Sequence, residues 1–260
     1  MARRTGDAAG GGRGFTLVEL LVVVAIIALL IGVLLPALGR ARRSAQTVEC
    51  LSNMRNLVLA QMLYAHDHNG QLVNYGLSHG GSTLEDNVSW LRDLKPYAEG
   101  PLTVRSPSDA SPHWATEGGG GVPIPGGGPV RYRVTSYGLN EHVTPQVPFD
   151  PQDPRQRAHD NLYRMRAPAS TIQWVMMAQE GEFAGADHVH VTNWWIGDFA
   201  PNAPAQLAAR QMQTDAHGGP AETFEARANY AFLDGRAATL MLREVYENPR
   251  SNKFDPRFAR

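Results

Sequence analysis

The chain has 260 residues, which suits one large or two small domains. Its formal net charge of -1 argues against a nucleic-acid-binding protein, because such a protein carries a surplus of basic residues. The 26 glycines and 18 prolines predict a loop-rich protein rather than a helix bundle.

The chain begins with a small, basic segment over residues 1–14, in which three arginines stand against one aspartate. A long apolar segment follows, and residues 20–38 contain no charge. As a helix with a rise of about 1.5 Å per residue, that stretch would span about 28 Å, close to the hydrocarbon thickness of a bilayer. A secretory signal has a shorter apolar core and is cleaved after it. We therefore expect a membrane-spanning helix over residues 15–38, with a plain signal anchor as the alternative.

The junction between these two segments reads Gly14-Phe15-Thr16-Leu17-Val18-Glu19. It closely resembles the signature of type IV prepilins and type II secretion pseudopilins: a basic leader ending in Gly, then Phe, three mostly apolar residues, Glu and an apolar stretch. The resemblance covers about the first 65 residues. It implies that a prepilin peptidase cleaves between Gly14 and Phe15 on the cytoplasmic side, and that Phe15 is N-methylated. Pro36 lies where many pilins carry a proline that bends the helix, and we expect a kink there.

Glu19 is the one charge inside this apolar helix. A carboxylate there costs on the order of 2.5–3.5 kcal/mol on the insertion scale, so it is read as functional. Cleavage would create an amine on Phe15, four residues away on the same helix face. The amine of one subunit and Glu19 of a neighbour could neutralise each other and fix the axial stagger of a filament. The same two charges could also pair within one subunit.

The helix is expected to continue beyond the membrane as an amphipathic segment over residues 39–66, whose apolar face packs onto a head. Gly70 suits a left-handed cap, so the whole helix is placed over 15–70. The apolar positions at helical spacing are Val48, Leu51, Met54, Val58, Met62 and Ala65.

The head, residues 71–260, is expected to consist of strands and long loops. Segments 171–178 and 188–195 are rich in β-branched and aromatic residues and are predicted strands. Asp234 and Gly235 separate two further strand-like runs and predict a hairpin with a type I′ turn, in which both would have positive φ. The fold class is therefore α+β: a long N-terminal helix packed on a mainly antiparallel sheet.

The head also resembles a large subgroup of bacterial pseudopilin-type proteins. The segments that carry this resemblance are 50–53, 64–70, 136–140 and, near the end, His217 with 229–235. Relatives often have Cys-Pro-Ser where this chain has Ser at position 106, which leaves Cys50, its one cysteine, without a partner for a disulfide. We interpret Cys50 as a free structural thiol, with intermolecular pairing as the alternative.

Three patterns were weighed as sites for chemistry. Ser78 lies in a Gly-x-Ser-x-Gly motif, which needs a strand before it and a helix after it. His188 and His190 would share one strand face as half of a metal site, as would His66 and His68. The resemblance to major pseudopilins, which often bind calcium in a C-terminal loop, makes calcium a candidate ion; the candidate ligands are Asp198, Asp215 and Asp234.

We conclude from the sequence that the chain is a structural, non-enzymatic subunit of a pilus or of a type II secretion pseudopilus. The resemblance implies that it lies in the inner membrane with a cytoplasmic leader and a periplasmic or extracellular head. Its partners would be the bilayer, the prepilin peptidase, an inner-membrane assembly platform and other pilins, including copies of itself. Two alternatives stay open: an adhesin or glycan-binding protein delivered by the same pathway, and a membrane-tethered hydrolase that uses Ser78. No cofactor is expected apart from calcium.

Overall fold

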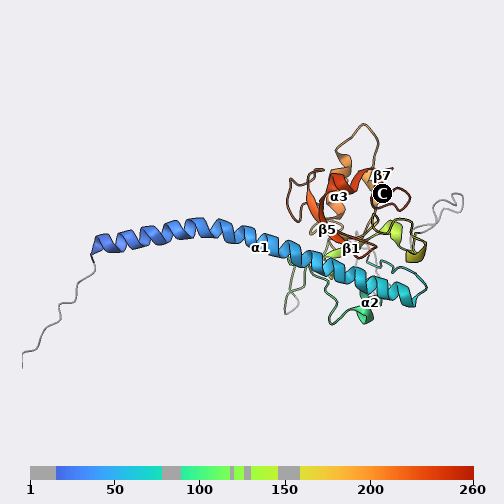
Figure 1. The fold of residues 1–260 in the computed structure, drawn as a ribbon, viewed down its shortest axis with the longest axis horizontal. Coiled ribbons are helices and arrows are strands. Elements are labelled where there is room, and N and C mark those ends of the chain that lie inside the picture. Colours follow the sequence, from blue (N-terminus) through green and yellow to red (C-terminus); the bar gives the residue numbers. More distant parts are fainter. Residues whose placement is uncertain (1–15, 78–88, 118–119, 126–129, 146–158) are drawn as a thin grey trace, which may run out of the picture. The chain divides into compact units, whose positions relative to one another are not determined.

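The computed structural model describes residues 16–77, 89–117, 120–125, 130–145 and 159–260. The chain forms two compact units, one ending at Ser44 and the other covering Ala45–Arg260. A single helix, α1 (Leu17–Asp67), supplies residues to both units (Figure 1).

Within the first unit, α1 carries no charge from Leu20 to Leu38. Its large apolar side chains from Leu17 to Leu38 are exposed. Within the described residues, α1 is the one helix long and apolar enough to cross a membrane, judged by length and composition; its most apolar window has a mean hydropathy of 3.2 and no buried residue. The helix runs through Pro36 without a break in its assignment.

The other end of α1 is closed by a left-handed turn. Asn69 and Gly70 have φ of 54° and 86°, and the Gly70 amide donates to the Ala65 carbonyl at 2.6 Å. This six-to-one hydrogen bond is typical of a Schellman motif, in which Asn69 takes the first left-handed position. A Cβ on Gly70 would also come within 2.6 Å of the Asn161 side chain. The predicted stop of the helix is confirmed.

The second unit is built on a five-stranded sheet with the order β3-β1-β2-β4-β5. β1 and β3 are parallel, and the other neighbouring strands are antiparallel. A separate pair, β6 and β7, is antiparallel. The strands are β1 (Tyr137–Asn140), β2 (Ile172–Met176), β3 (His188–Val189), β4 (Arg227–Phe232), β5 (Ala237–Met241), β6 (Tyr246–Asn248) and β7 (Ser251–Asn252).

Short helices complete this unit. They are α2 (Trp90–Asp93), η2 (Lys95–Tyr97), η3 (Glu141–Val143), η4 (Leu162–Arg164), η5 (Val191–Trp194), α3 (Ala203–Gln211) and α4 (Leu242–Val245).

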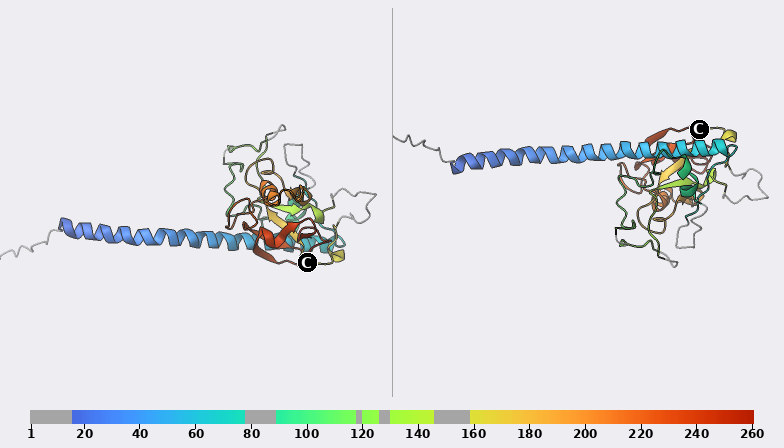
Figure 2. Two further views of the ribbon diagram at one scale, coloured as in Figure 1. Left: turned by 90° about the horizontal axis from the view of Figure 1, so that it is seen from above. Right: turned by 90° about the horizontal axis from the view of Figure 1, so that it is seen from below.

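The sheet separates two apolar clusters. On one face, Met54 and Val58 of α1 pack with Trp174 and Ala231 of the sheet. On the other, Val175 and Tyr230 pack with side chains from η5, α3 and α4. Both views of Figure 2 show the cyan end of α1 lying against the strands. The α+β architecture expected from the sequence is confirmed.

The buried face of α1 is rotated from the predicted stripe. Met54, Val58 and Ala65 are fully buried, as expected, but Val48 is 65% exposed. At about 100° per residue, Val48 lies about 120° around the helix from Met54. Leu57, one residue from Val58, is buried instead. The inclusion of Val48 in the packed stripe is therefore wrong.

The predicted strand over 171–178 is confirmed as β2, but the one over 188–195 is mostly wrong. β3 ends at Val189, and the chain turns into η5. Trp194 is fully buried, with its ring edge-on to Tyr246 and Phe254 at centroid distances of 5.2 and 5.0 Å, and Trp195 is half-buried.

The hairpin around Asp234 forms as predicted, but with a different turn. The Phe232 amide donates to the Arg236 carbonyl at 2.8 Å, so three residues form the loop. Gly235 has a φ of 93°, whereas Asp234 is not among the residues with positive φ. This pattern is typical of a three-residue loop that ends in a left-handed glycine, so the type I′ turn is wrong.

Candidate functional site

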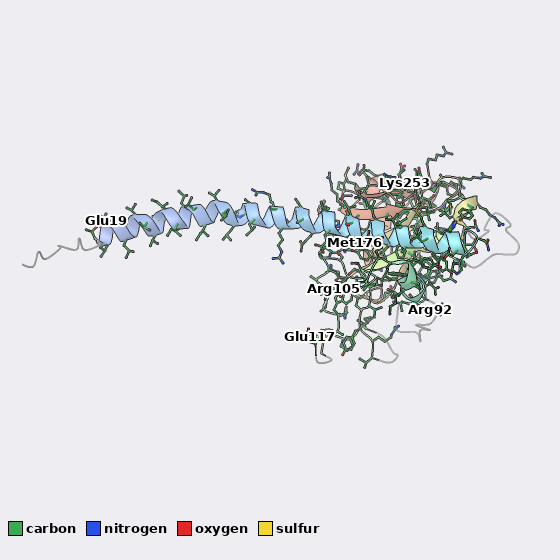
Figure 3. The ribbon with its side chains drawn as sticks, turned by 60° about the horizontal axis from the view of Figure 1, so that its bottom comes forward. Glu19, Arg92, Arg105, Glu117, Met176 and Lys253 are labelled. Carbon is green, nitrogen blue, oxygen red and sulfur yellow. The ribbon has the colours of Figure 1, made fainter. Side chains whose placement is uncertain are left out.

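Glu19 caps its own helix. Its Oε2 accepts hydrogen bonds from the Thr16 amide at 2.8 Å and the Thr16 hydroxyl at 2.7 Å, and the Glu19 amide donates back to the Thr16 hydroxyl at 3.2 Å. This is a capping box, and its signal in the sequence is the Thr-x-x-Glu spacing. Figure 3 shows Glu19 at the beginning of α1. The carboxylate thus lies at the positive end of the helix dipole.

The predicted cleavage site, Gly14 and Phe15, lies outside the described residues. The processing there, the assembly role of Glu19 and the kink at Pro36 therefore stay predictions.

The outer part of α1 is fixed to the sheet by polar contacts as well as by its apolar face. Asn229 on β4 donates through Nδ2 to the Thr47 carbonyl at 3.1 Å, and the Thr47 hydroxyl lies 3.1 Å from His217 Nδ1. Burial lowers the pKa of His217 from 6.5 to about 4, so the ring is neutral at pH 7. The His217 backbone amide in turn donates to the Arg227 carbonyl at the start of β4.

The structure gives a physical reason for two of the segments that carry the head resemblance, 50–53 and 136–140. Cys50 is fully buried beneath β1 and β2, where its thiol lies 3.5 Å from Met176 Sδ and receives the Tyr137 hydroxyl at 3.7 Å. Burial raises the pKa of this thiol, which makes it unreactive. Figure 3 shows Met176 beside α1. Gly138 has no room for a side chain, because a Cβ would meet Met177 Sδ at 2.1 Å.

A buried ion pair holds the loops at the edge of β1 and β2. Arg133 Nε donates to Asp109 Oδ2 at 2.8 Å, and both side chains are 1% exposed. The guanidinium also donates to the carbonyls of Ala178, Ala184 and Met177. Nothing in the sequence pattern pointed to this pair, because 24 residues separate its members.

The structure does not bring the acidic candidates for calcium into one site. Asp198 follows η5, Asp215 lies in the turn before His217, and Asp234 lies in the β4–β5 loop, where its Oδ1 accepts from the Arg236 amide at 3.0 Å. Within the described ranges, no group of three or more His, Cys, Asp or Glu residues could hold a metal ion. Calcium binding at these residues stays a prediction.

Only one of the two histidine pairs brings its ring nitrogens close together. His188 and His190 lie with their Nε2 atoms 3.1 Å apart. His66 lies in the last turn of α1 and His68 follows it, so they do not share a face; His68 instead stacks on Tyr64 at 3.9 Å. Both histidines are exposed, His68 Nδ1 lies 2.8 Å from the Tyr64 carbonyl oxygen, and the pair does not form the half-site considered from the sequence.

The described part of the chain offers little support for the hydrolase and glycan-binding alternatives. Ser78 lies outside the described residues, and residues 72–77 before it form no strand, which a nucleophile elbow requires. Three of the five tryptophans, Trp90, Trp174 and Trp194, are fully buried and offer no face to a sugar.

The N-terminal segment of the chain is similar to known proteins. The family model for the prokaryotic N-terminal methylation motif matches residues 12–35. The chain is also 42% identical over 80 residues to the type IV wide pilus major component PilA4 of Thermus thermophilus. Over these segments the chain is similar to type IV pilins. No solved structure matches it.

The likeness to this pilin is partial. The alignment covers 30% of the chain and 61% of the relative, so the chain spans about three fifths of that protein's length. The motif match contains Gly14, Phe15 and Glu19, and it runs into the apolar segment of α1, which by length and composition could anchor the chain in a membrane.

Proposed function

We propose that this chain is a structural subunit of a type IV pilus or a type II secretion pseudopilus. In this proposal a prepilin peptidase cleaves it after Gly14 at the inner membrane, and Phe15 is methylated. An assembly platform then extracts it from the bilayer into a filament, with its head on the periplasmic or extracellular side.

The observation that carries the proposal is Glu19 at the start of an exposed apolar segment of α1 that is otherwise uncharged up to Leu38 and lies largely inside the matched motif. Outside a bilayer, apolar side chains exposed from Leu17 to Leu38 require another covering surface. Identical helices of neighbouring subunits supply one. A buried carboxylate then requires a cation, and the amine of a processed Phe15 supplies it at the right depth.

The second unit supports the same proposal. Three apolar side chains on the outer part of α1 face away from the sheet: Val48, Leu59 and Leu63 are 65%, 53% and 54% exposed. Leu59 and Leu63, one helical turn apart, line a groove with Pro101 and Leu102. A groove of this kind suits the helix of an adjacent subunit.

Replacement of Glu19 by Ala tests the proposal. We expect the variant to insert into the membrane as well as the unchanged protein, because the change removes an unfavourable charge from the bilayer. Filament assembly should be lost, because the amine of the neighbouring subunit has no partner. Glu49→Ala is the matched control, since Glu49 is an exposed acid on the same helix beyond the apolar part.

The assay is the amount of the chain in sheared filaments relative to the membrane fraction, measured by immunoblotting in the host. Loss of filaments for Glu19→Ala and not for Glu49→Ala supports the proposal. Normal filaments with Glu19→Ala would refute a role of this carboxylate in assembly.

A further inference from the structure

The two converging histidines belong to a network that reaches across three elements. His188 lies on β3, His190 follows it, and Glu141 begins η3, 49 residues away in the chain. Each ring has a carboxylate at its Nδ1 atom. His188 Nδ1 is 3.2 Å from Asp187 Oδ1, and His190 Nδ1 is 2.6 Å from Glu141 Oε2.

Both carboxylates accept hydrogen bonds from further donors. Asp187 is fully buried and accepts the amides of Gly76 and Leu77, each at 3.0 Å, and the Ser89 hydroxyl at 3.1 Å. Glu141 accepts the Thr192 hydroxyl at 3.2 Å through its other oxygen, Oε1. Because each carboxylate oxygen acts as an acceptor, each histidine donates to it from Nδ1, and the lone pair lies on Nε2 at the far side of the ring.

Two Nε2 lone pairs that face each other at 3.1 Å repel unless a cation lies between them. With zinc–nitrogen bonds of about 2.0–2.1 Å, two ligand nitrogens lie about 2.9 Å apart at a right angle and about 3.3 Å apart at the tetrahedral angle. The observed separation falls between these values. A carboxylate on the far nitrogen of each ring is also the arrangement that orients histidines bound to a metal.

We propose that His188 and His190 form a binding site for one divalent transition-metal ion, with zinc as the representative, held by their Nε2 atoms. Oxygen ligands complete the coordination. Asp187 and Glu141 act as positioning residues, and Tyr75 fixes the first ring by stacking on it at a centroid distance of 3.7 Å. The His188 side chain is 4% exposed and that of His190 is 20% exposed, so the ion reaches the site from the His190 side.

The site uses a class of ligand different from that of the calcium candidates. Calcium prefers oxygen ligands, whereas imidazole nitrogen suits zinc, copper and nickel. The inference also stands apart from the proposed filament, because its residues all lie in the second unit, away from Glu19.

The test uses the full chain, purified in detergent with a tag that contains no histidine and stripped with a chelator. Titration calorimetry with ZnCl2 should give one site per chain. His190→Gln should weaken binding at least 10-fold, and Glu141→Gln, which keeps the shape of the positioning residue, by about 10- to 100-fold. The matched control is His66→Gln with His68→Gln, which removes an exposed histidine pair and should leave the affinity unchanged.

X-ray absorption at the zinc edge gives a readout that does not depend on any variant. Two imidazole nitrogens at about 2.0 Å, with oxygen in the remaining positions, are the expected result. Absence of zinc binding by the unchanged chain would show that a shared proton holds the two rings together, and would overturn the proposal. Equal binding by His190→Gln would overturn it as well.

Discussion

Removal of the buried counter-charge at Asp109 should destabilise the head strongly. Asp109→Asn keeps the size of the side chain but leaves the Arg133 guanidinium charged at 1% exposure. Breaking a buried ion pair by removal of one partner costs about 3–5 kcal/mol. We expect about 3 kcal/mol here, because Arg133 keeps its hydrogen bonds to three backbone carbonyls. That is a large share of the roughly 5–15 kcal/mol by which domains are stable.

The assay is urea unfolding, followed by circular dichroism, of a soluble protein that begins at residue 43 and so contains the whole second unit. The control is Asp93→Asn at the Arg92–Asp93 pair, whose side chains are 57% and 19% exposed; it should cost less than about 1 kcal/mol. Addition of Arg133→Met to Asp109→Asn should recover part of the loss, since no buried charge then remains. Equal effects of Asp109→Asn and Asp93→Asn would refute the reasoning.

Two further predictions concern the contacts beneath α1. The pKa of His217 is about 4 in the folded protein and about 6.5 when unfolded, so the unfolded state binds more protons between these values. The free energy of unfolding should therefore fall by up to about 3 kcal/mol from pH 7 to pH 4 through this residue. The difference between the unchanged protein and His217→Gln across a pH series measures this contribution. Ser106→Cys should form a disulfide with Cys50, because both side chains are buried and Ser106 lies close enough to the thiol to act on its pKa. Closure of a loop of roughly 55 residues is worth up to about 4 kcal/mol, seen as a melting temperature that drops on reduction. A thiol that still reacts after oxidation and unfolding would contradict this proximity.

The features that the sequence predicted correctly depend on local patterns. An uncharged run such as 20–38 specifies an apolar helix by itself, and the Asn-Gly end of α1 requires left-handed residues. The burial of Met54 and Val58 follows from helical spacing. Helical spacing alone does not show which residues lie at the middle of the buried face. Val48 was therefore included in the stripe, although it lies about 120° around the helix from Met54.

The errors arise where tertiary contacts override local preference. Val191 and Trp194 favour a strand by their residue types. In the structure they lie in η5, which packs the Trp194 ring against Tyr246 and Phe254. The pairing of His190 with Glu141 spans 49 residues, and no periodicity reveals it. The spacing of His188 and His190 indicated that the two rings could lie close together, but the carboxylates beside them can be found only from the fold.

The most direct test of the account is the intact mass of the chain extracted from membranes, with and without an active prepilin peptidase. We expect the mature protein to begin with N-methylated Phe15. Loss of residues 1–14 removes three arginines and one aspartate, which changes the formal net charge from -1 to -3. The chain from the strain without peptidase should retain residues 1–14. Retention of the leader where the peptidase is active would contradict the assignment of this chain as a processed filament subunit.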